Sequence, residues 1–274
     1  MENAVAKNGP EFLHIAREAA LSASGIILEH LGKLRQADIA QKQLADFVTT
    51  VDRESEQVIV GILRRHFPEH RILAEETVHE QDEGGFLWII DPLDGTTNYI
   101  HGLPVFAVSI ALQYQGTVIA GVVLDPVRQE CFTALRGQGA HINGKALHIS
   151  SAMTAERALI ATGFPFKRRE LVDRYLAAFR RVFVRVSDLR RAGAAALDLA
   201  YVAGGRCDGF FELGLNAWDA AAGSLLIEEA GGVITDFGGG NRYLATGNIV
   251  AGNPFIHGLL LDEVQAVFQD ILPA

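Results

Sequence analysis

Cysteine is scarce in this sequence, which has only Cys131 and Cys207 among its 274 residues. The two form no paired motif and give no basis for a disulfide framework, so we expect a reducing, cytoplasmic location. Residues 1–10 lack the apolar segment of a signal peptide, and no stretch reaches the roughly 18 uninterrupted apolar residues that a membrane span requires. A soluble protein with no membrane partner is therefore expected.

Basic residues are also in deficit, with 24 Lys and Arg against 33 Asp and Glu and a formal net charge of -9. Nucleic-acid binding depends on clustered Lys and Arg that release counterions from the phosphate backbone. The basic segments 167–169 and 190–191 are short, and the second could equally hold a phosphate. We therefore expect no nucleic-acid partner. The hydrophobic content of 49% is that of an ordinary globular protein.

An apolar run at residues 86–90 ends abruptly in acid, with Asp91 and Asp94 followed by Gly95 and Thr96. The run predicts a buried strand, and Pro92, which has no N–H, is expected to end its hydrogen-bond ladder. Carboxylates for hard cations would then lie beside backbone N–H groups and hydroxyls for an anion. This combination is typical of a metal-assisted phosphoryl site, although an Asx-turn with solvated aspartates is the better explanation of the motif when it is taken alone.

A second predicted strand, at residues 71–74, also ends in acid at Glu75. Two neighbouring strands with carboxylates at their ends weaken the solvated-turn interpretation. A helix is predicted to open at Asp52, with Thr50 or Asp52 as its cap, and another near Asp219, for which capping is again the simplest role. No histidine pair has metal-binding spacing, and no Ser-His-Asp or Cys-His order is present.

The remaining pattern predicts a layered α/β protein without a linker between domains. We expect one compact unit, residues 1–274, of two halves at about 1–150 and 151–274, with the site between them. The further predicted helices are 11–32, 169–183, 193–203, 219–230 and 256–272, and a loop or irregular hairpin is expected at 37–50. The further predicted strands are 105–114, 117–124, 131–135, 140–142, 158–162, 184–187, 209–212, 233–236 and 249–251.

Several motifs together resemble the inositol monophosphatase family, and within it the bacterial inositol-1-monophosphatases, in order and spacing. They are Glu75-Glu76-Thr77, Trp88-Ile89-Ile90-Asp91-Pro92-Leu93-Asp94-Gly95-Thr96-Thr97-Asn98, Trp218-Asp219 with Gly223, and Glu229 to Gly232. The resemblance covers the chain from about Asp46 to the C-terminus. It implies an α/β (α+β) fold, layered as the αβαβα sandwich of the inositol monophosphatase and sugar phosphatase type. It also implies a homodimer and inhibition by lithium.

The resemblance also implies a set of metal ligands for two or three Mg2+ ions. Glu75, Asp91 and the Leu93 carbonyl would hold the first ion, Asp91, Asp94 and Asp219 the second, and Glu75 again a weaker third. Carboxylates about 4 Å apart repel by about 4 kcal/mol per pair at an effective dielectric constant of 20, so such a cluster requires cations. Oxygen ligands without Cys or His favour a hard ion such as Mg2+.

The catalytic residues implied by the resemblance are Glu75 and the pair Thr96 and Asp52, near which a metal-bound water is activated. Backbone N–H groups of Gly95 and Thr96 would hold the phosphate. The polyol contacts would come from Asp94, from Glu212 and from the backbone of Gly193, Ala194 and Ala195. Without the resemblance, Asp52 is best explained as a helix cap, Thr96 as a turn hydroxyl and Glu212 as a solvated strand end.

The expected function is Mg2+-dependent hydrolysis of a small phosphorylated polyol, most simply myo-inositol 1-phosphate to myo-inositol and phosphate. The same chemistry on histidinol phosphate, fructose 1,6-bisphosphate or a 3'-phosphonucleotide is the alternative, because the shared motifs contact the phosphate and not the alcohol. Ala194 stands where many relatives have Thr or Ser, which leaves the alcohol undecided. A regulatory binding protein that keeps an ancestral site is the other alternative, and the presence of all four acidic ligands argues against it.

Overall fold

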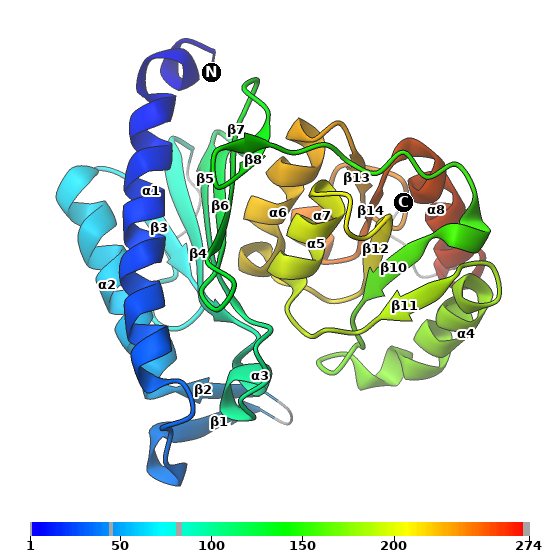
Figure 1. Ribbon diagram of the computed structural model, residues 1–274, viewed down its shortest axis with the longest axis horizontal. Helices are drawn as coiled ribbons and strands as arrows, with labels where there is room; N and C mark the ends of the chain where they lie inside the picture. Colours follow the sequence, from blue (N-terminus) through cyan, green and yellow to red (C-terminus); the bar gives the residue numbers. More distant parts are fainter. Residues whose placement is uncertain (1, 44–45, 81–83, 271–274) are drawn as a thin grey trace.

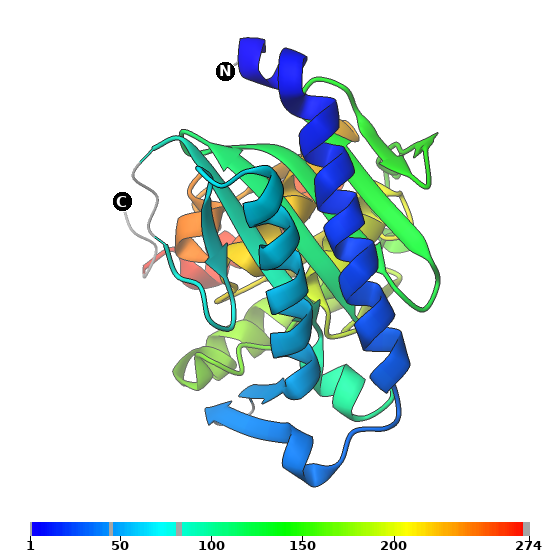
Figure 2. The same ribbon diagram turned by 90° about the vertical axis from the view of Figure 1, so that its left-hand side faces the viewer.

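The computed structural model describes residues 2–43, 46–80 and 84–270. Its elements form five layers in the order helices, sheet, helices, sheet, helices (Figure 1), which confirms the predicted αβαβα arrangement. Two helices, α1 (Glu2–His30) and α2 (Thr50–His66), lie side by side across the outer face of the larger sheet (Figure 2). The middle layer contains α5 (Ala195–Ala203) and α6 (Ala217–Glu229), and the far layer contains α4 (Val172–Phe183) and α8 (Pro254–Phe268).

The larger sheet has seven strands in the order β3-β4-β5-β6-β7-β8-β9. Only β3 and β4 are parallel, and the other neighbours form the predicted antiparallel meander. At its turns, Gln115 and Asn143 take positive φ together with the glycines that follow them, as the tight hairpins predicted here require. The strands are β3 (Arg71–Ala74), β4 (Phe86–Asp94), β5 (Ala107–Tyr114), β6 (Thr117–Asp125), β7 (Glu130–Leu135), β8 (Ala140–Ile142) and β9 (Lys145–Ala146).

The prediction that Pro92 ends the ladder of β4 is wrong. Pairing with β5 continues to Asp94, which lies opposite Ala107, and the register shifts between Asp91 and Asp94. Three steps along β4 correspond to two along β5, so one extra residue bulges out of the ladder. A proline is tolerated at such a bulge because its missing N–H costs no ladder bond there.

The smaller sheet has five strands in the order β11-β10-β12-β14-β13, with β14 antiparallel to both neighbours. The strand predicted at 184–187 is wrong: the N–H groups of Val184 and Arg185 bond back to the last turn of α4, at Arg180 and Val182, and the strand begins at Asp188. The strands are β10 (Leu159–Thr162), β11 (Asp188–Arg190), β12 (Gly209–Glu212), β13 (Val233–Thr235) and β14 (Ile249–Gly252).

Several short elements and ends complete the fold. The hairpin of β1 (Ile39–Gln43) and β2 (Asp46–Thr49) is irregular, as expected, with a register shift after Gln41. The first helix starts well before residue 11 and contains Pro10. The predicted end of the last helix, 271–272, lies outside the described residues. Residues 81–83 of the predicted loop before β4 also lie outside them. Other short helices are η1 (Gln36–Asp38), α3 (Thr96–Ile100), η2 (Ala155–Arg157), η3 (Arg169–Leu171) and α7 (Tyr243–Thr246), of which η1, η2 and α7 were not predicted.

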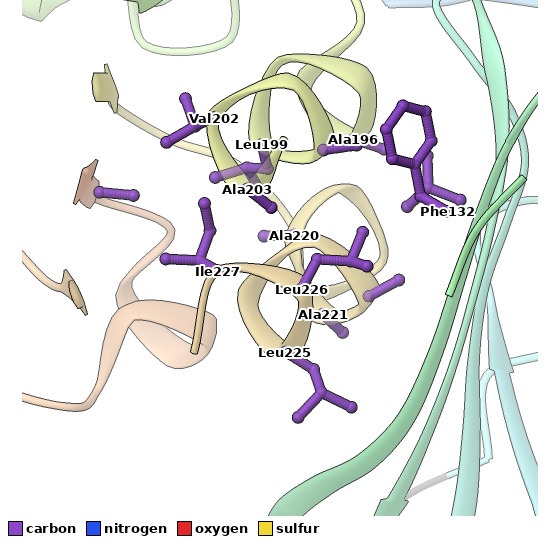
Figure 3. Close-up of a cluster of buried hydrophobic side chains, with 14 of the residues drawn as sticks. Phe132, Ala196, Leu199, Val202, Ala203, Ala220, Ala221, Leu225, Leu226 and Ile227 are labelled. Carbon is purple, nitrogen blue, oxygen red and sulfur yellow. The ribbon is translucent and has the colours of Figure 1, made fainter. Parts of the chain in front are cut away.

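Small residues let the middle helices pack closely against each other and against the larger sheet (Figure 3). A Cβ built on Gly223 of α6 would lie 2.6 Å from Cβ of Leu199 on α5. On the other side, a Cβ on Gly121 of β6 would lie 3.0 Å from the carbonyl oxygen of Ala222. These contacts fix the position of α6, whose first turn carries Asp219. Among the helices that the structure describes, none has the length and apolar content needed to cross a membrane.

Replacing Gly223 by Ala is therefore expected to destabilise the protein by about 1–3 kcal/mol, the usual cost of forcing an extra carbon into a packed core. The matched control is Gly61→Ala in the middle of α2, where an added Cβ would have nothing within 4 Å. That change should be neutral or stabilise by up to about 1 kcal/mol because Ala is the better helix former. Urea unfolding of both variants measures the difference, and equal stabilities would contradict the close packing of α5 and α6.

Candidate active site

A cavity of about 310 Å³ opens where β4, α3, α5, β12 and α6 meet. Eleven of the twelve residues predicted for the site line this cavity, and Asp52 is the exception because it is buried beneath Thr96. The predicted residues that line it are Glu75, Asp91, Leu93, Asp94, Gly95, Thr96, Gly193, Ala194, Ala195, Glu212 and Asp219.

The first turn of α2 places Asp52. The prediction that Thr50 or Asp52 caps this helix is wrong, because the cap is Thr49, whose hydroxyl accepts the N–H of Val51. Asp52 is the third helical residue, and its Oδ2 accepts the N–H of Thr49 at 2.9 Å. Its Oδ1 accepts a hydrogen bond from the Thr96 hydroxyl at 2.9 Å. The structure therefore brings Asp52 and Thr96 together although they are 44 residues apart.

Burial raises the pKa of Asp52 to about 6, since its hydrogen bonds to Thr49 and Thr96 offset only part of the cost of desolvation. Thr96 Oγ1 is also 3.1 Å from the Leu93 carbonyl oxygen. The hydroxyl has one proton to donate to these two acceptors, and its oxygen also has lone pairs that can accept a hydrogen bond. Thr96 Oγ1 can therefore accept a hydrogen bond from a donor in the cavity, such as a water.

Gly95 caps the short helix α3 from a left-handed conformation, with φ of 91°. A Cβ at this position would lie 2.9 Å from the Val105 carbonyl oxygen and 3.3 Å from Cβ of Ala194. Only glycine fits both the backbone conformation and the space. The backbone at Gly95 consequently lies close to Gly193 and Ala194, which also line the cavity.

The two aspartates of β4 are buried, with exposed fractions of 1% for Asp91 and 8% for Asp94. Asp91 Oδ1 accepts the N–H of Leu93 at 3.0 Å, and Asp94 Oδ2 accepts the N–H of Ala196, at the start of α5, at 2.8 Å. Burial raises the pKa of both carboxyls well above the usual range, and the neighbouring charges of Glu75 and Asp219 raise both further. Two ionised carboxylates in this place are stable only with a compensating cation.

Asp219 enters the cavity from the opposite side, on the first turn of α6. The prediction that Asp219 caps the helix is wrong, because the cap is Asn216. Asp219 is the third helical residue, and its Oδ2 accepts the N–H of Asn216 at 2.7 Å. The Ser109 hydroxyl of β5 donates to the Trp218 carbonyl at 3.2 Å, which ties this turn to the larger sheet. Asp219 raises the pKa of Asp94 through its charge, so the two carboxylates are electrostatic neighbours.

The donors that surround the cavity fit a hard cation. They are carboxylates and backbone carbonyls, without Cys or His. Within residues 2–43, 46–80 and 84–270, no three His, Cys, Asp or Glu side chains are gathered so that they could hold a metal ion by themselves. The oxygen-bearing side chains that line the cavity suit Mg2+, which takes one or two carboxylates and completes its shell with waters and substrate phosphate.

The wall opposite β4 is formed by the second half of the chain. Glu212, at the end of β12, occupies the space where residue 163 would have a side chain: a Cβ on Gly163 would lie 2.0 Å from Oε1 of Glu212. Burial raises the pKa of Glu212 well above its usual range, and the charges of Asp198 and Asp219 add to this while Arg191 opposes it. The predicted backbone segment 193–195 lines the same cavity.

Asp198, near this wall, was not predicted as a site residue, whereas Lys167 and Arg191 belong to the two basic segments noted in the sequence, of which 190–191 was considered for holding a phosphate. Asp198 on α5 is 3% exposed, and burial raises its pKa to about 8 while Arg191 opposes the shift. Its sequence signal was a single carboxylate within an apolar helix of small residues. Arg191 and Lys167 line the cavity and bring basic charge to it, and the Arg191 guanidinium lies 5.0 Å from the ring centre of Phe166.

Known proteins that are similar to this chain match its sequence over most of its length. The family model described as "Inositol monophosphatase family" matches residues 10–269. A protein of Pseudomonas aeruginosa named "Nus factor SuhB" is 50% identical over 258 residues, which are 92% of this chain and 95% of that protein.

Two solved structures confirm the predicted fold class. The extragenic suppressor protein suhB of Bartonella henselae has a TM-score of 0.89 and 41% identity, covering 93% of this chain and 98% of that one. The inositol monophosphatase of Anabaena (Nostoc) sp. PCC 7120 has a TM-score of 0.85 and 42% identity, covering 95% and 98%. The family-model match over nearly the whole chain, together with these relatives, shows that this chain belongs to the inositol monophosphatase family.

Proposed function

We propose that this chain hydrolyses myo-inositol 1-phosphate to myo-inositol and phosphate, in a reaction that depends on Mg2+. The observation that carries the proposal is the convergence on one cavity of Asp91, Asp94 and Asp219 with the hydrogen-bonded pair of Thr96 and Asp52. Membership of the family supports phosphatase chemistry. The substrate is proposed from the resemblance and from the lining of the cavity.

The ligands proposed for two or three Mg2+ ions are Glu75, Asp91, the Leu93 carbonyl, Asp94 and Asp219. When bound, these ions would supply charge neutralisation at the phosphate and a water of lowered pKa. The ionised Asp52 accepts a hydrogen bond from the Thr96 hydroxyl, so that Thr96 Oγ1 can in turn accept a hydrogen bond from the attacking water and orient it. The backbone N–H groups of Gly95 and Thr96 are proposed to hold the phosphate oxygens.

The second half of the chain is proposed to contact the alcohol. Glu212, Asp94 and the backbone of residues 193–195 surround the part of the cavity that a polyol would fill. We propose that residues 1–274 form one phosphatase unit of two halves with the site between them, that it is a homodimer, and that lithium inhibits it by occupying a metal position. Histidinol phosphate, fructose 1,6-bisphosphate and 3'-phosphonucleotides remain the alternative substrates for the same chemistry.

The first test is a panel of these phosphomonoesters with Mg2+, read by phosphate release for the purified protein and for Asp219→Asn. We expect myo-inositol 1-phosphate to be hydrolysed fastest. We expect Asp219→Asn to lose more than about 100-fold in kcat/KM, because mutating even a residue that only hydrogen-bonds to a metal ligand lowers activity about 10- to 100-fold. The variant should also lose the rise in melting temperature that Mg2+ gives the wild type.

The matched control for this test is Asp262→Asn, which removes an exposed carboxylate from α8, far along the chain from the site. Its turnover and its response to Mg2+ should equal those of the wild type. Undiminished turnover by Asp219→Asn would contradict the ligand assignment. Absence of turnover of every ester by the wild type would contradict the enzymatic function.

The role of Glu212 is tested through Gly163→Ala, because the new methyl group would occupy the place of the Glu212 carboxylate. We expect KM for myo-inositol 1-phosphate to rise about 10-fold, the effect of losing a hydrogen bond to a charged group. The kcat/KM for p-nitrophenyl phosphate, which has no alcohol hydroxyls, should change by less than about twofold. Gly258→Ala, at an open position of α8, is the control. Equal losses for both esters would show that Glu212 does not contact the polyol.

A second candidate function is favoured by the names of the relatives. Proteins as much as 50% identical to this chain are named Nus factor SuhB, so we propose that the chain also serves as a Nus factor, in line with the regulatory alternative. The absence of a nucleic-acid partner stays a prediction.

Complementation separates the two candidates. The chain and its Asp219→Asn variant would each replace the Nus factor SuhB of Pseudomonas aeruginosa in a deletion strain. If the Nus role is independent of hydrolysis, both should restore growth to the same degree. Restoration by the wild type alone would show that the cellular role requires the metal site, and restoration by neither would contradict the second candidate.

A further inference from the structure

A second buried acid of α2, Glu56, lies one turn after Asp52 on the same face of the helix. Its exposed fraction is 1%, the same as that of Asp52. Glu56 does not line the cavity and belongs to none of the motifs singled out from the sequence. Burying a carboxylate costs several kcal/mol unless donors compensate for the lost water, so its partners need an explanation.

Those partners are three donors of the turn that follows β3. Glu56 Oε2 accepts the N–H of Glu76 at 2.7 Å, and Oε1 accepts both the N–H of Thr77 at 2.9 Å and the Thr77 hydroxyl. Charge-assisted hydrogen bonds of this kind are about twice as strong as neutral ones. The carboxylate therefore holds two consecutive peptide groups across a gap of about 20 residues in the chain.

The residue immediately before these two peptide groups is Glu75, the proposed ligand shared by two metal positions. Its own N–H donates to the Ile90 carbonyl of β4 at 3.1 Å, and the N–H of Ala74 donates to the Val78 carbonyl at 2.6 Å. The peptide before Glu75 is thus fixed by the larger sheet, and the two after it are fixed by Glu56. With both flanks held, the Cα–Cβ bond of Glu75 has one direction, toward the cavity that Glu75 lines.

A role in folding alone would not require a carboxylate here. The turn at 75–77 is partly exposed, and water can satisfy N–H groups in such a turn. The carboxylate instead adds a buried negative charge to a region that already contains Asp52, Glu75 and Asp91. What it adds in return is a rigid connection between α2, which also places Asp52, and the turn that carries Glu75.

We propose that Glu56 is a positioning residue that fixes the Glu76 and Thr77 peptides and thereby directs the Glu75 carboxylate to the metal position. The proposal rests on the proposed Mg2+-dependent function. One helix then sets both parts of the water-activating apparatus: Asp52 orients Thr96, and Glu56, one turn later, orients Glu75.

The test is Glu56→Gln, which keeps the size of the side chain but replaces one acceptor oxygen with an NH2 group that faces an N–H donor. We expect the Mg2+ concentration for half-maximal activity to rise about 10-fold, as for other residues that orient metal ligands, while activity at saturating Mg2+ falls less than threefold. The affinity for Mn2+, measured by electron paramagnetic resonance of the purified protein, should fall by the same factor. Glu56→Asp, which keeps the charge, should recover part of the loss.

The matched control is Glu80→Gln in the same loop. Glu80 likewise joins the loop to its surroundings, by accepting the N–H of Ile72 at 2.8 Å and the Arg64 guanidinium at 3.0 Å, but it does not hold the peptides next to Glu75. Its Mg2+ and Mn2+ dependence should equal that of the wild type. A lower melting temperature of Glu56→Gln with unchanged Mg2+ and Mn2+ dependence would overturn the proposal and leave Glu56 a purely structural residue.

A second variant and a binding measurement that is independent of turnover complete the test. If Glu56→Gln does not fold, Thr77→Val removes only the hydroxyl donor, and it should weaken Mn2+ binding by about threefold; unchanged binding would overturn the proposal. If the wild type hydrolyses no phosphomonoester, the proposed function fails but the Mn2+ affinity still decides the role of Glu56. A 10-fold loss in Glu56→Gln would then support positioning, and equal affinities would overturn it.

Discussion

The repulsion between buried carboxylates is the constraint on which the rest of this structure depends. The charge of Asp94 raises the cost of ionising Asp91, and the charges of Glu75 and Asp219 raise that cost for both aspartates. Side chains under such repulsion would turn apart unless they were held, and each of the aspartates is held in the same way. One oxygen of Asp52, Asp91, Asp94 and Asp219 accepts a backbone N–H, from Thr49, Leu93, Ala196 and Asn216 respectively.

The layered fold brings these anchors together from distant parts of the chain. Asp52 comes from the outer helix layer, Asp91 and Asp94 from the larger sheet, and Asp219 from the middle layer (Figure 1). The middle layer can approach because α5, α6 and β6 have Gly and Ala where larger residues would collide. The small-residue packing and the acidic site are therefore one arrangement: larger side chains between the layers would separate Asp219 from Asp94.

Much of this could be predicted from the sequence because strand ends have clear signals. Apolar runs that stop at Asp91 and Glu75 located two sides of the cavity, and the turn residues located the meander. The misses have local physical causes. The bulge that accommodates Pro92 depends on pairing with β5, and the start of β11 depends on how far the last turn of α4 extends. Thr49 and Asn216 displaced the predicted caps because each helix start has more than one polar residue that could serve as its cap.

Glu56 shows a different limit of sequence reasoning. An acid one turn from a helix start is ordinarily solvated, and nothing in its neighbours along the chain indicates that its donors lie 20 and 21 residues away. Only the packing of α2 against β4 and the hydrogen bonds to the turn after β3 reveal that it is enclosed. A residue of this kind contacts neither metal nor substrate and instead fixes the backbone of a residue that does. It can be recognised from its contacts in the structure, and not from the local sequence. In this chain such residues connect the acid-bearing strand ends to α2, so the geometry of the site and the packing of the outer layer depend on the same helix.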